Sequence, residues 1–459
     1  MCKNSLVKCW QIASNLEKWK SDLEKPLANC RVYFNELQLN KPRQYRNIPE
    51  VNGYHLLFYK FTSESFTRRY EYHRELMEAN GIFRFAREFL HNTDTYRKLT
   101  FSERLGDHTL LTKFLGKTSV LLSNGDVWKR HRKIANPAFH KNWNTKVFGS
   151  ASARLGWEAD RLIKEEGIDA GVEVHGLMQS IENPNGPYVT IYNHLVKVPS
   201  ISFFHYPIGG RARLHEEIKI FDKLIFDIVD SKREQIHKQG DNFDEASADL
   251  LAMMIRAMEQ ESPEKGLSKK ELRHDTTANA LACAFYYLAA NPAIQSKARA
   301  EILSEMGDRD SDPDPDTIPT MEQTKSFAYI DLIIKESMRL SPSVVQLPAR
   351  TVDNDTMLGE YLLPNNTHVL LNIYAIHHNP KYWGKDVEEF RPERFEDETK
   401  RDPLAWLPFS SGSRAFFRRY FYTLLSLAIT NHSPSQSGIG TNFSLIEQRV
   451  VLAMFRKSH

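Results

Sequence analysis

Apolar and charged residues recur at spacings of three and four along most of the chain, which is the pattern of helices that bury one face. This spacing predicts four helices, over residues 62–90, 214–239, 275–290 and 326–342. A further short, basic helix is expected after the turn at Asn124 and Gly125. It should stop near Pro137, because proline removes a backbone donor.

The pattern changes after Pro342, where short apolar runs alternate with turn residues. The segments VVQLPARTV, EYLLPNNTHVLLNIYAIHHNP and FRPERF are typical of short strands and turns. The predicted fold class is therefore mainly α, with a small β portion late in the chain.

The composition is that of a packed protein, with 41% hydrophobic and 26% charged residues among 459. The net charge of +3 gives no reason to expect nucleic acid as a partner. Cys2, Cys9, Cys30 and Cys283 have neither CxxC spacing nor a nearby histidine pair. We therefore expect neither a zinc site nor a disulfide framework, and a reducing intracellular compartment.

Glu336 and Arg339 lie three residues apart in the most apolar predicted helix, so they share one face. They could form an ordinary surface pair, but neighbours such as Ile333 and Met338 favour burial. A buried carboxylate and guanidinium need further hydrogen-bond partners. Arg394 in FRPERF is the candidate, although a loop arginine is usually just solvated.

Two other groups of residues each allow two interpretations. Trp128 and Arg132, four apart among basic residues, indicate either a solvated basic helix or a site for a carboxylate. Asp275 and Thr276 indicate either a helix N-cap or an acid–alcohol pair that relays protons.

The motifs ESMR, FRPERF and PFSSGSRA, in this order over the last third, resemble those of the cytochrome P450 superfamily of haem-thiolate monooxygenases. The upstream segments WKRHR and HDTTANAL resemble further signatures, and the likeness runs from about residue 101 to the end, with gaps. It implies a cytochrome P450 fold, partly truncated here. Residues 61–459 would form one catalytic domain after a polar region at 1–60.

The resemblance also implies an activity of the eukaryotic microsomal type. One oxygen atom of O2 would enter a small apolar substrate of the lipid or xenobiotic class. The cofactor would be haem b, with electrons from NADPH through a flavoprotein reductase. The family implies the cytosolic face of the endoplasmic reticulum membrane. This chain shows no anchor or other transmembrane segment, so a soluble cytoplasmic protein is the alternative.

The resemblance assigns roles to individual residues. It places Glu336, Arg339 and Arg394 in a structural buried triad, and Asp275 and Thr276 in proton delivery. The residues implied to bind the cofactor are Trp128, Arg132, Arg350 and Arg414, which would hold haem propionates, and the loop 409–414 with Phe409 and Gly412, which would shield the axial sulfur.

One position departs from the family pattern. Phe416 stands in direct register where the family has its haem-ligand cysteine, and Gly438 stands there if 416–437 is an aberrant insertion. No metal ligand is then intact, since we expect His432, within that insertion, to bind nothing. The alternative to a monooxygenase is therefore a non-catalytic remnant, or a haem-binding or interaction protein.

Overall fold

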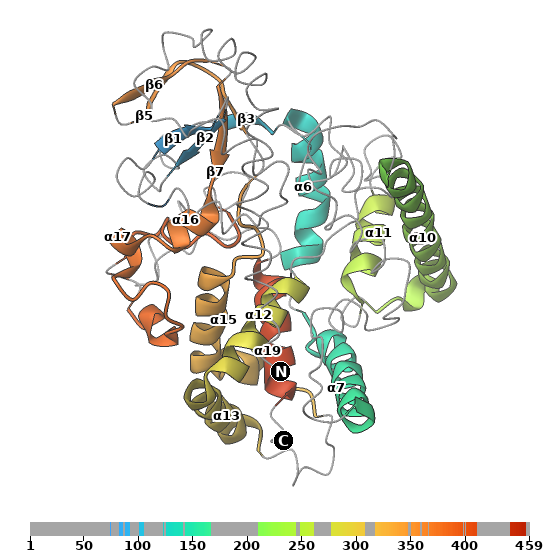
Figure 1. Ribbon diagram of the computed structural model, residues 1–459. Coiled ribbons are helices and arrows are strands. Elements are labelled where there is room, and N and C mark those ends of the chain that lie inside the picture. Colours follow the sequence, from blue (N-terminus) through green and yellow to red (C-terminus); the bar gives the residue numbers. More distant parts are fainter. Residues whose placement is uncertain are drawn as a thin grey trace, which may run out of the picture.

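The structure is a computed structural model. It describes residues 74, 82–85, 88–91, 101–104, 123, 125–140, 143–166, 210–244, 248–260, 277–307, 317–347, 350–358, 360–365, 367–397, 399, 401–410 and 441–455. As the sequence predicts, the described part is mainly helical with a smaller β portion (Figure 1). Most of its helices gather on one side of a sheet region that lies at the top of the view.

The helices are α6 (Gly125–His140), α7 (Lys146–Glu166), α10 (Gly210–Gln239), α11 (Leu250–Gln260), α12 (Thr277–Ala290), α13 (Pro292–Met306), α14 (Met321–Ser326), α15 (Ala328–Leu340), α16 (Ile373–His377), α17 (Pro380–Trp383) and α19 (Thr441–Met454). Two short 3₁₀ helices are η2 (Gly240–Asn242) and η5 (Pro392–Phe395). Among the described helices, none combines the length and the apolarity needed to cross a bilayer.

The strands are β1 (Ile82–Phe85), β2 (Glu88–His91), β3 (Phe101–Arg104), β4 (Arg350–Val352), β5 (Thr356–Leu358), β6 (Tyr361–Leu363) and β7 (His368–Leu371). Five of them form a sheet in the order β1-β2-β7-β4-β3, while β5 and β6 form a separate antiparallel pair. Within the larger sheet, β2 and β7 run parallel and the other neighbours run antiparallel. The sheet therefore joins segments from both halves of the chain.

The main core lies between α12, α13, α15 and α19, which Figure 1 shows side by side. Helix α15 contributes Ile330, Ile333, Ile334 and Met338, which are almost fully buried and recur at helical spacing. Helix α19 adds an apolar run that includes Ala453, which is fully buried. This packing places α15 at the centre of the described helices, so a polar residue on its inner face has little access to water.

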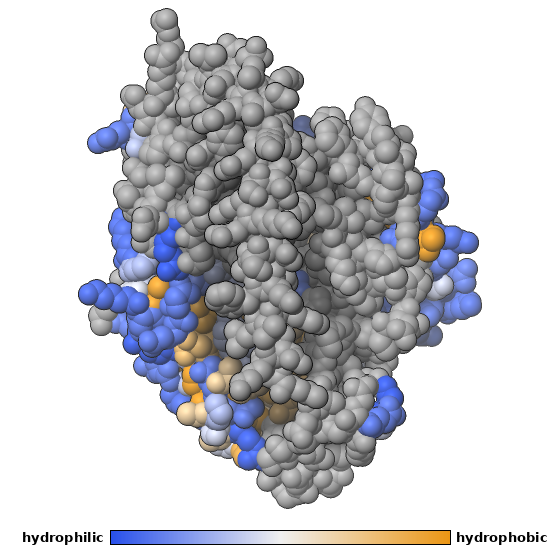
Figure 2. Space-filling model, viewed as in Figure 1, coloured by the Kyte–Doolittle hydropathy of each residue, from blue (hydrophilic) through white to orange (hydrophobic). Residues whose placement is uncertain are grey.

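A second, smaller core holds α10 against α11, with Val229 and Ile255 at its centre. The opposite side of α10 is exposed and carries charged residues together with Ile220 and Ile228. On the face shown in Figure 2, the described surface is largely hydrophilic, with apolar residues grouped at the lower left, where α12, α13 and α15 lie. Helix α10 is thus a surface helix, in contrast to α15.

The predicted helices over 214–239 and 326–342 are confirmed as α10 and α15, with ends shifted by a few residues. Residues 277–290 of the helix predicted over 275–290 form α12, and residues 275 and 276 lie outside the described residues. Such shifts at helix ends are expected, because end residues lack part of the hydrogen-bond pattern.

Several predictions of secondary structure were wrong. The β portion is not confined to the late part of the chain, since β1, β2 and β3 lie before residue 105, and Ile373–His377, in a segment expected to form strands and turns, is helix α16. The end of the range 62–90 forms strands β1 and β2 rather than helix, because pairing of β2 with β7 overrides the local spacing. The basic helix does not stop at Pro137, since α6 continues to His140. Proline keeps a helical φ and loses only one donor, so it bends or weakens a helix without always ending it.

Candidate functional site

The start of α15 is fixed by a carboxylate from α13. Phe327, the residue before the helix, supplies no side-chain cap. Instead, the two carboxylate oxygens of Glu301 accept hydrogen bonds from the backbone N–H groups of Tyr329 at 2.7 Å and Ile330 at 2.9 Å. A carboxylate at this end of a helix also interacts favourably with the helix dipole. The position of α15, and of the polar residues further along it, is therefore set from its first turn.

Glu336 and Arg339 form a bidentate pair on α15, and both side chains are 0% exposed. Arg339 donates through Nε to Glu336 Oε2 at 2.7 Å and through Nη2 to Glu336 Oε1 at 2.9 Å. It also donates to the backbone carbonyls of His377 at 3.0 Å and Glu389 at 3.3 Å. These bonds compensate for removing the two charges from water, a removal that is otherwise costly.

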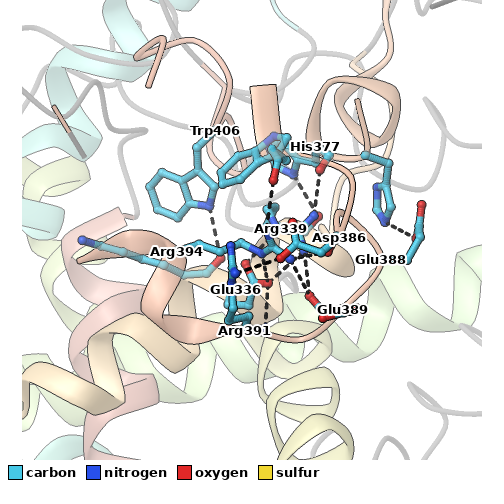
Figure 3. A network of polar contacts seen from close by, with 12 residues as sticks. Glu336, Arg339, His377, Asp386, Glu388, Glu389, Arg391, Arg394 and Trp406 are labelled. Atoms are coloured by element: carbon cyan, nitrogen blue, oxygen red, sulfur yellow. Dashed lines mark hydrogen bonds and ion pairs between the residues drawn. The ribbon is translucent and has the colours of Figure 1, made fainter. Parts of the chain in front are cut away.

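Arg394 reaches the same carboxylate from η5. Its Nε lies 3.2 Å from Glu336 Oε1, and the backbone N–H of Arg391 donates to that oxygen at 3.0 Å. Figure 3 shows these groups converging on Glu336 from α15 and from the segment around η5. The structure therefore brings Glu336, Arg339 and Arg394 together in one buried cluster, which we call the Glu336 network.

The Glu336 network contains a fourth charge that the sequence did not point to. Two guanidinium groups against one carboxylate would leave an excess positive charge, and Asp386 supplies the second carboxylate. Its Oδ1 accepts from Arg394 Nη1 at 2.9 Å, and its Oδ2 lies 3.0 Å from Arg391 Nη1. The hydrogen bond from Arg394 is the largest effect on the Asp386 carboxyl and lowers its pKa. Asp386 thus balances the charge of Arg394, as Glu336 balances that of Arg339.

Sequence reasoning also missed Trp383 and His377, both buried beside the network. The Trp383 ring lies 5.1 Å from the guanidinium carbon of Arg339 and 4.3 Å from that of Arg401, and its carbonyl accepts from Arg394 at 2.9 Å. His377 ends α16, one residue after the buried Ile376. The position of His377 directly after an apolar run could have indicated its burial from the sequence. Asp386 lies in a turn, where no periodic pattern indicates which side chains are buried.

Helix α6 carries Trp128 and Arg132, for which the sequence allows either a solvated basic helix or a carboxylate site. Arg132 is buried, whereas Lys129 and Lys133 are exposed and Trp128 is half-buried. Burial lowers the pKa of the Arg132 guanidinium to about 10, because desolvation disfavours its charged form. The lysines are therefore solvated, whereas Arg132 lies on the buried side of α6. This helix also contacts α19.

The remaining candidates lie at the margins of the described residues. Arg350 is the first residue of β4, where its backbone pairs with Val369 of β7, and its side chain is outside the described part. Phe409 packs against the main core, with its ring 6.4 Å from that of Trp406. Six candidate residues lie wholly outside the described residues: Asp275, Thr276, Gly412, Arg414, Phe416 and Gly438.

The described residues contain no group of three or more His, Cys, Asp or Glu side chains that could hold a metal ion. Cys283, on α12, is a free thiol whose pKa is raised by burial. These observations concern only the residues whose positions the structure gives.

Comparison with known proteins identifies the segment around the network. The family model described as Cytochrome P450 matches residues 187–415, which include the whole Glu336 network. The chain is 29% identical over 357 residues to Cytochrome P450 734A1 of Arabidopsis thaliana, covering 70% of this chain and 66% of that protein. It is 27% identical over 383 residues to human Cytochrome P450 4F8, covering 73% and 67%.

A third relative is the Cytokinin hydroxylase of Arabidopsis thaliana, 25% identical over 378 residues and covering 74% of this chain and 65% of that protein. The chain thus spans about two thirds of the length of the curated relatives it matches. The family model, these relatives and the mainly helical fold agree with the resemblance of the motifs. The chain belongs to the cytochrome P450 family.

Proposed function

We propose that the chain carries the scaffold of a haem-dependent monooxygenase, which inserts one oxygen atom of O2 into a small apolar organic substrate. Electrons would come from NADPH through a flavoprotein reductase. The observation that carries the proposal is the burial of Glu336, Arg339 and Arg394 against one another within the segment that matches the family model. The name of the related Cytokinin hydroxylase is consistent with this class of reaction.

The residues of α6 fit one side of a haem group. Arg132 is a buried guanidinium, and guanidinium groups form strong, charge-assisted hydrogen bonds with carboxylates. Haem has two propionates, so Arg132 and Trp128, together with Arg350 and Arg414, would hold them. When bound, haem supplies the chemistry of oxygen activation. The loop 409–414 would shield the residue that ligates the iron, and Asp275 and Thr276 would deliver protons.

The axial position does not fit the family pattern, which favours a second candidate function. Neither Phe416 nor Gly438 has a side chain that can ligate iron, whereas a cysteine at this position would hold the haem through its thiolate and support oxygen activation. The second candidate is a non-catalytic protein that binds haem through its propionates, or that serves only as a partner of a reductase.

For the monooxygenase, we further propose a substrate of the lipid or xenobiotic class. We also propose that the protein is located at the cytosolic face of the endoplasmic reticulum membrane, as is usual in the family.

Hemin titration of the full chain separates these candidates. The proposed scaffold predicts binding that Arg132→Gln weakens about tenfold, because a charge-assisted contact to a propionate is lost. The matched control is Lys133→Gln at the exposed neighbour, which should change the affinity little. Equal affinity of both variants and the parent chain would contradict the carboxylate site on α6.

A second protein tests the monooxygenase itself. It lacks residues 416–437 and carries Gly438→Cys, which restores a cysteine at the family position. Absorption and electron paramagnetic resonance spectra should then show thiolate ligation. Oxidation of an apolar probe should require both NADPH and a flavoprotein reductase. Thiolate ligation without such oxidation, or no haem binding by either protein, would favour the non-catalytic candidate.

A further inference from the structure

His377 joins two segments that are far apart in the sequence. Its imidazole is fully buried, with Nδ1 3.2 Å from the backbone carbonyl oxygen of Arg339 and Nε2 2.8 Å from the backbone nitrogen of Leu407. Arg339 in turn donates through Nη1 to the carbonyl of His377 at 3.0 Å. Histidine and arginine therefore hold each other through two bonds (Figure 3), and the imidazole also accepts from the backbone N–H of Leu407.

The two partners fix the chemical form of this imidazole. A backbone N–H only donates, so Nε2 must present its lone pair to Leu407. A carbonyl oxygen only accepts, so Nδ1 must carry the proton that points at Arg339. His377 is thus neutral, in the Nδ1–H tautomer. Burial and the positive charge of Arg339 also lower the pKa of His377 well below its usual value.

Leu407 begins the segment that leads into the loop 409–414. Its own carbonyl accepts from the N–H of Ser410 at 3.0 Å, which closes a turn, and Ser410 has a φ of 65°. The indole N–H of Trp406 donates to the carbonyl of Lys335 on α15 at 3.2 Å. The turn is therefore tied to α15 by Trp406 directly and by His377 through Arg339.

We propose that His377 is a positioning residue, which transmits the location of the Glu336 network to the turn that begins at Leu407. An apolar residue of the same size would fill the space but would leave the Leu407 N–H buried without an acceptor, which costs free energy. The network and the turn are then held as one unit whether or not a cofactor is present. This inference rests on the proposed function in one respect only, namely that the ligand next to the loop 409–414 would be haem.

Two substitutions separate the two bonds of the imidazole. In His377→Gln, the side-chain oxygen reaches the position of Nε2 and can accept from Leu407. In His377→Asn, the amide nitrogen reaches the position of Nδ1 and can donate to Arg339, but nothing accepts from Leu407. The matched control is His378→Asn, since His378 is also buried but its Nδ1 donates locally to the carbonyl of Tyr374 at 3.0 Å.

Amide hydrogen exchange of the full chain without haem is the readout. We expect His377→Asn to accelerate exchange at Leu407 on the order of tenfold or more, while His377→Gln and His378→Asn remain close to the parent. Equal exchange in the Asn and Gln variants would overturn the proposal. A tautomer measurement by ¹⁵N NMR covers the case in which His377→Asn fails to fold. The resonance that disappears in His377→Gln identifies His377 in the parent protein, and we expect it to be that of a neutral imidazole protonated at Nδ1. An imidazole protonated at Nε2 would overturn the proposal.

The failures of this inference and of the proposed function are distinguishable. If Leu407 responds as expected but hemin does not bind, the proposed function fails and His377 keeps its positioning role. If hemin binds and exchange at Leu407 does not respond, the positioning role alone fails.

Discussion

Two pairs of oppositely charged residues with the same spacing lie in opposite surroundings. Glu216 and Lys219 on α10 are 2.6 Å apart, and Glu336 and Arg339 on α15 are 2.7 Å apart, each pair three residues apart in the sequence. The side chains of the first pair are about two thirds exposed, at 66% and 64%, whereas those of the second are 0% exposed. The spacing is the same and the distances are similar, so the pairs differ mainly in their surroundings and in the bidentate contact that arginine makes and lysine does not.

The comparison shows what makes an ion pair structurally important. Water can replace either partner of the α10 pair, so such a pair contributes only tenths of a kcal/mol. Water cannot reach Glu336, whose carboxylate accepts from two guanidinium groups and a backbone N–H. Removing one buried partner leaves the others charged and unpaired, which costs about 3–5 kcal/mol.

The largest effect is expected for Glu336→Ala. Arg339 and Arg394 would lose their shared carboxylate in a buried site, so soluble folded protein should be lost. Any folded fraction should have a free energy of unfolding lower by about 3–5 kcal/mol. Yield of soluble protein and urea denaturation measure this effect. A normal yield of soluble protein with an unchanged free energy of unfolding would contradict the claim that the buried pair contributes more than the exposed one.

Acid should weaken the buried region through its two adjacent histidines. Burial lowers the pKa of His378 to about 4, against the opposing charge of Glu388, and that of His377 falls well below its usual value. Between about pH 6.5 and 4 the unfolded chain binds protons that the folded one does not. The free energy of unfolding should therefore fall as pH falls, by about 1.4 kcal/mol per pH unit for each histidine.

Urea denaturation between pH 5 and 6.5 checks this prediction. His378→Asn keeps the donor to Tyr374 but removes one titrating group, so the slope should drop by about 1.4 kcal/mol per pH unit. His237→Asn, at an exposed histidine of α10, is the matched control. A slope in His378→Asn equal to that of the parent would show that His378 is protonated in the folded protein too.

A smaller effect is expected for Asp386→Asn. Arg394 would lose one charged acceptor but keep Glu336 and the carbonyl of Trp383, so the cost should be about 1–2 kcal/mol. The control is Asp126→Asn, in the exposed pair with Lys129 on α6. If the two substitutions cost the same in urea denaturation, Asp386 does not belong to the network.

The smallest effect is expected for Glu216→Ala. Its pair with Lys219 is exposed and screened, so the free energy of unfolding should change by no more than about 0.5 kcal/mol. Repeating the denaturation in about 1 M salt should reduce even this difference. A loss comparable to that of Glu336→Ala would mean that spacing rather than burial determines the contribution of these pairs.

The sequence predicted those features that follow from local pattern. The apolar spacing around Glu336 located α15 and its buried face, and the need for a further partner pointed to Arg394. It could not reveal Asp386 or the contact of His377 with Leu407, because these depend on how the segments 373–407 fold back on α15. Strand β2 was missed for the same reason, since its second partner, β7, lies far along the chain, and β1 joins the sheet through β2.

The most direct test of the central claim exchanges the cations of the two pairs. Arg339→Lys keeps the charge but loses the bidentate contact and the donors to the carbonyls of His377 and Glu389, whereas Lys219→Arg alters an exposed pair. The account predicts that urea denaturation gives a loss of about 2–4 kcal/mol for Arg339→Lys and a change within about 0.5 kcal/mol for Lys219→Arg. Equal effects of the two substitutions would contradict it.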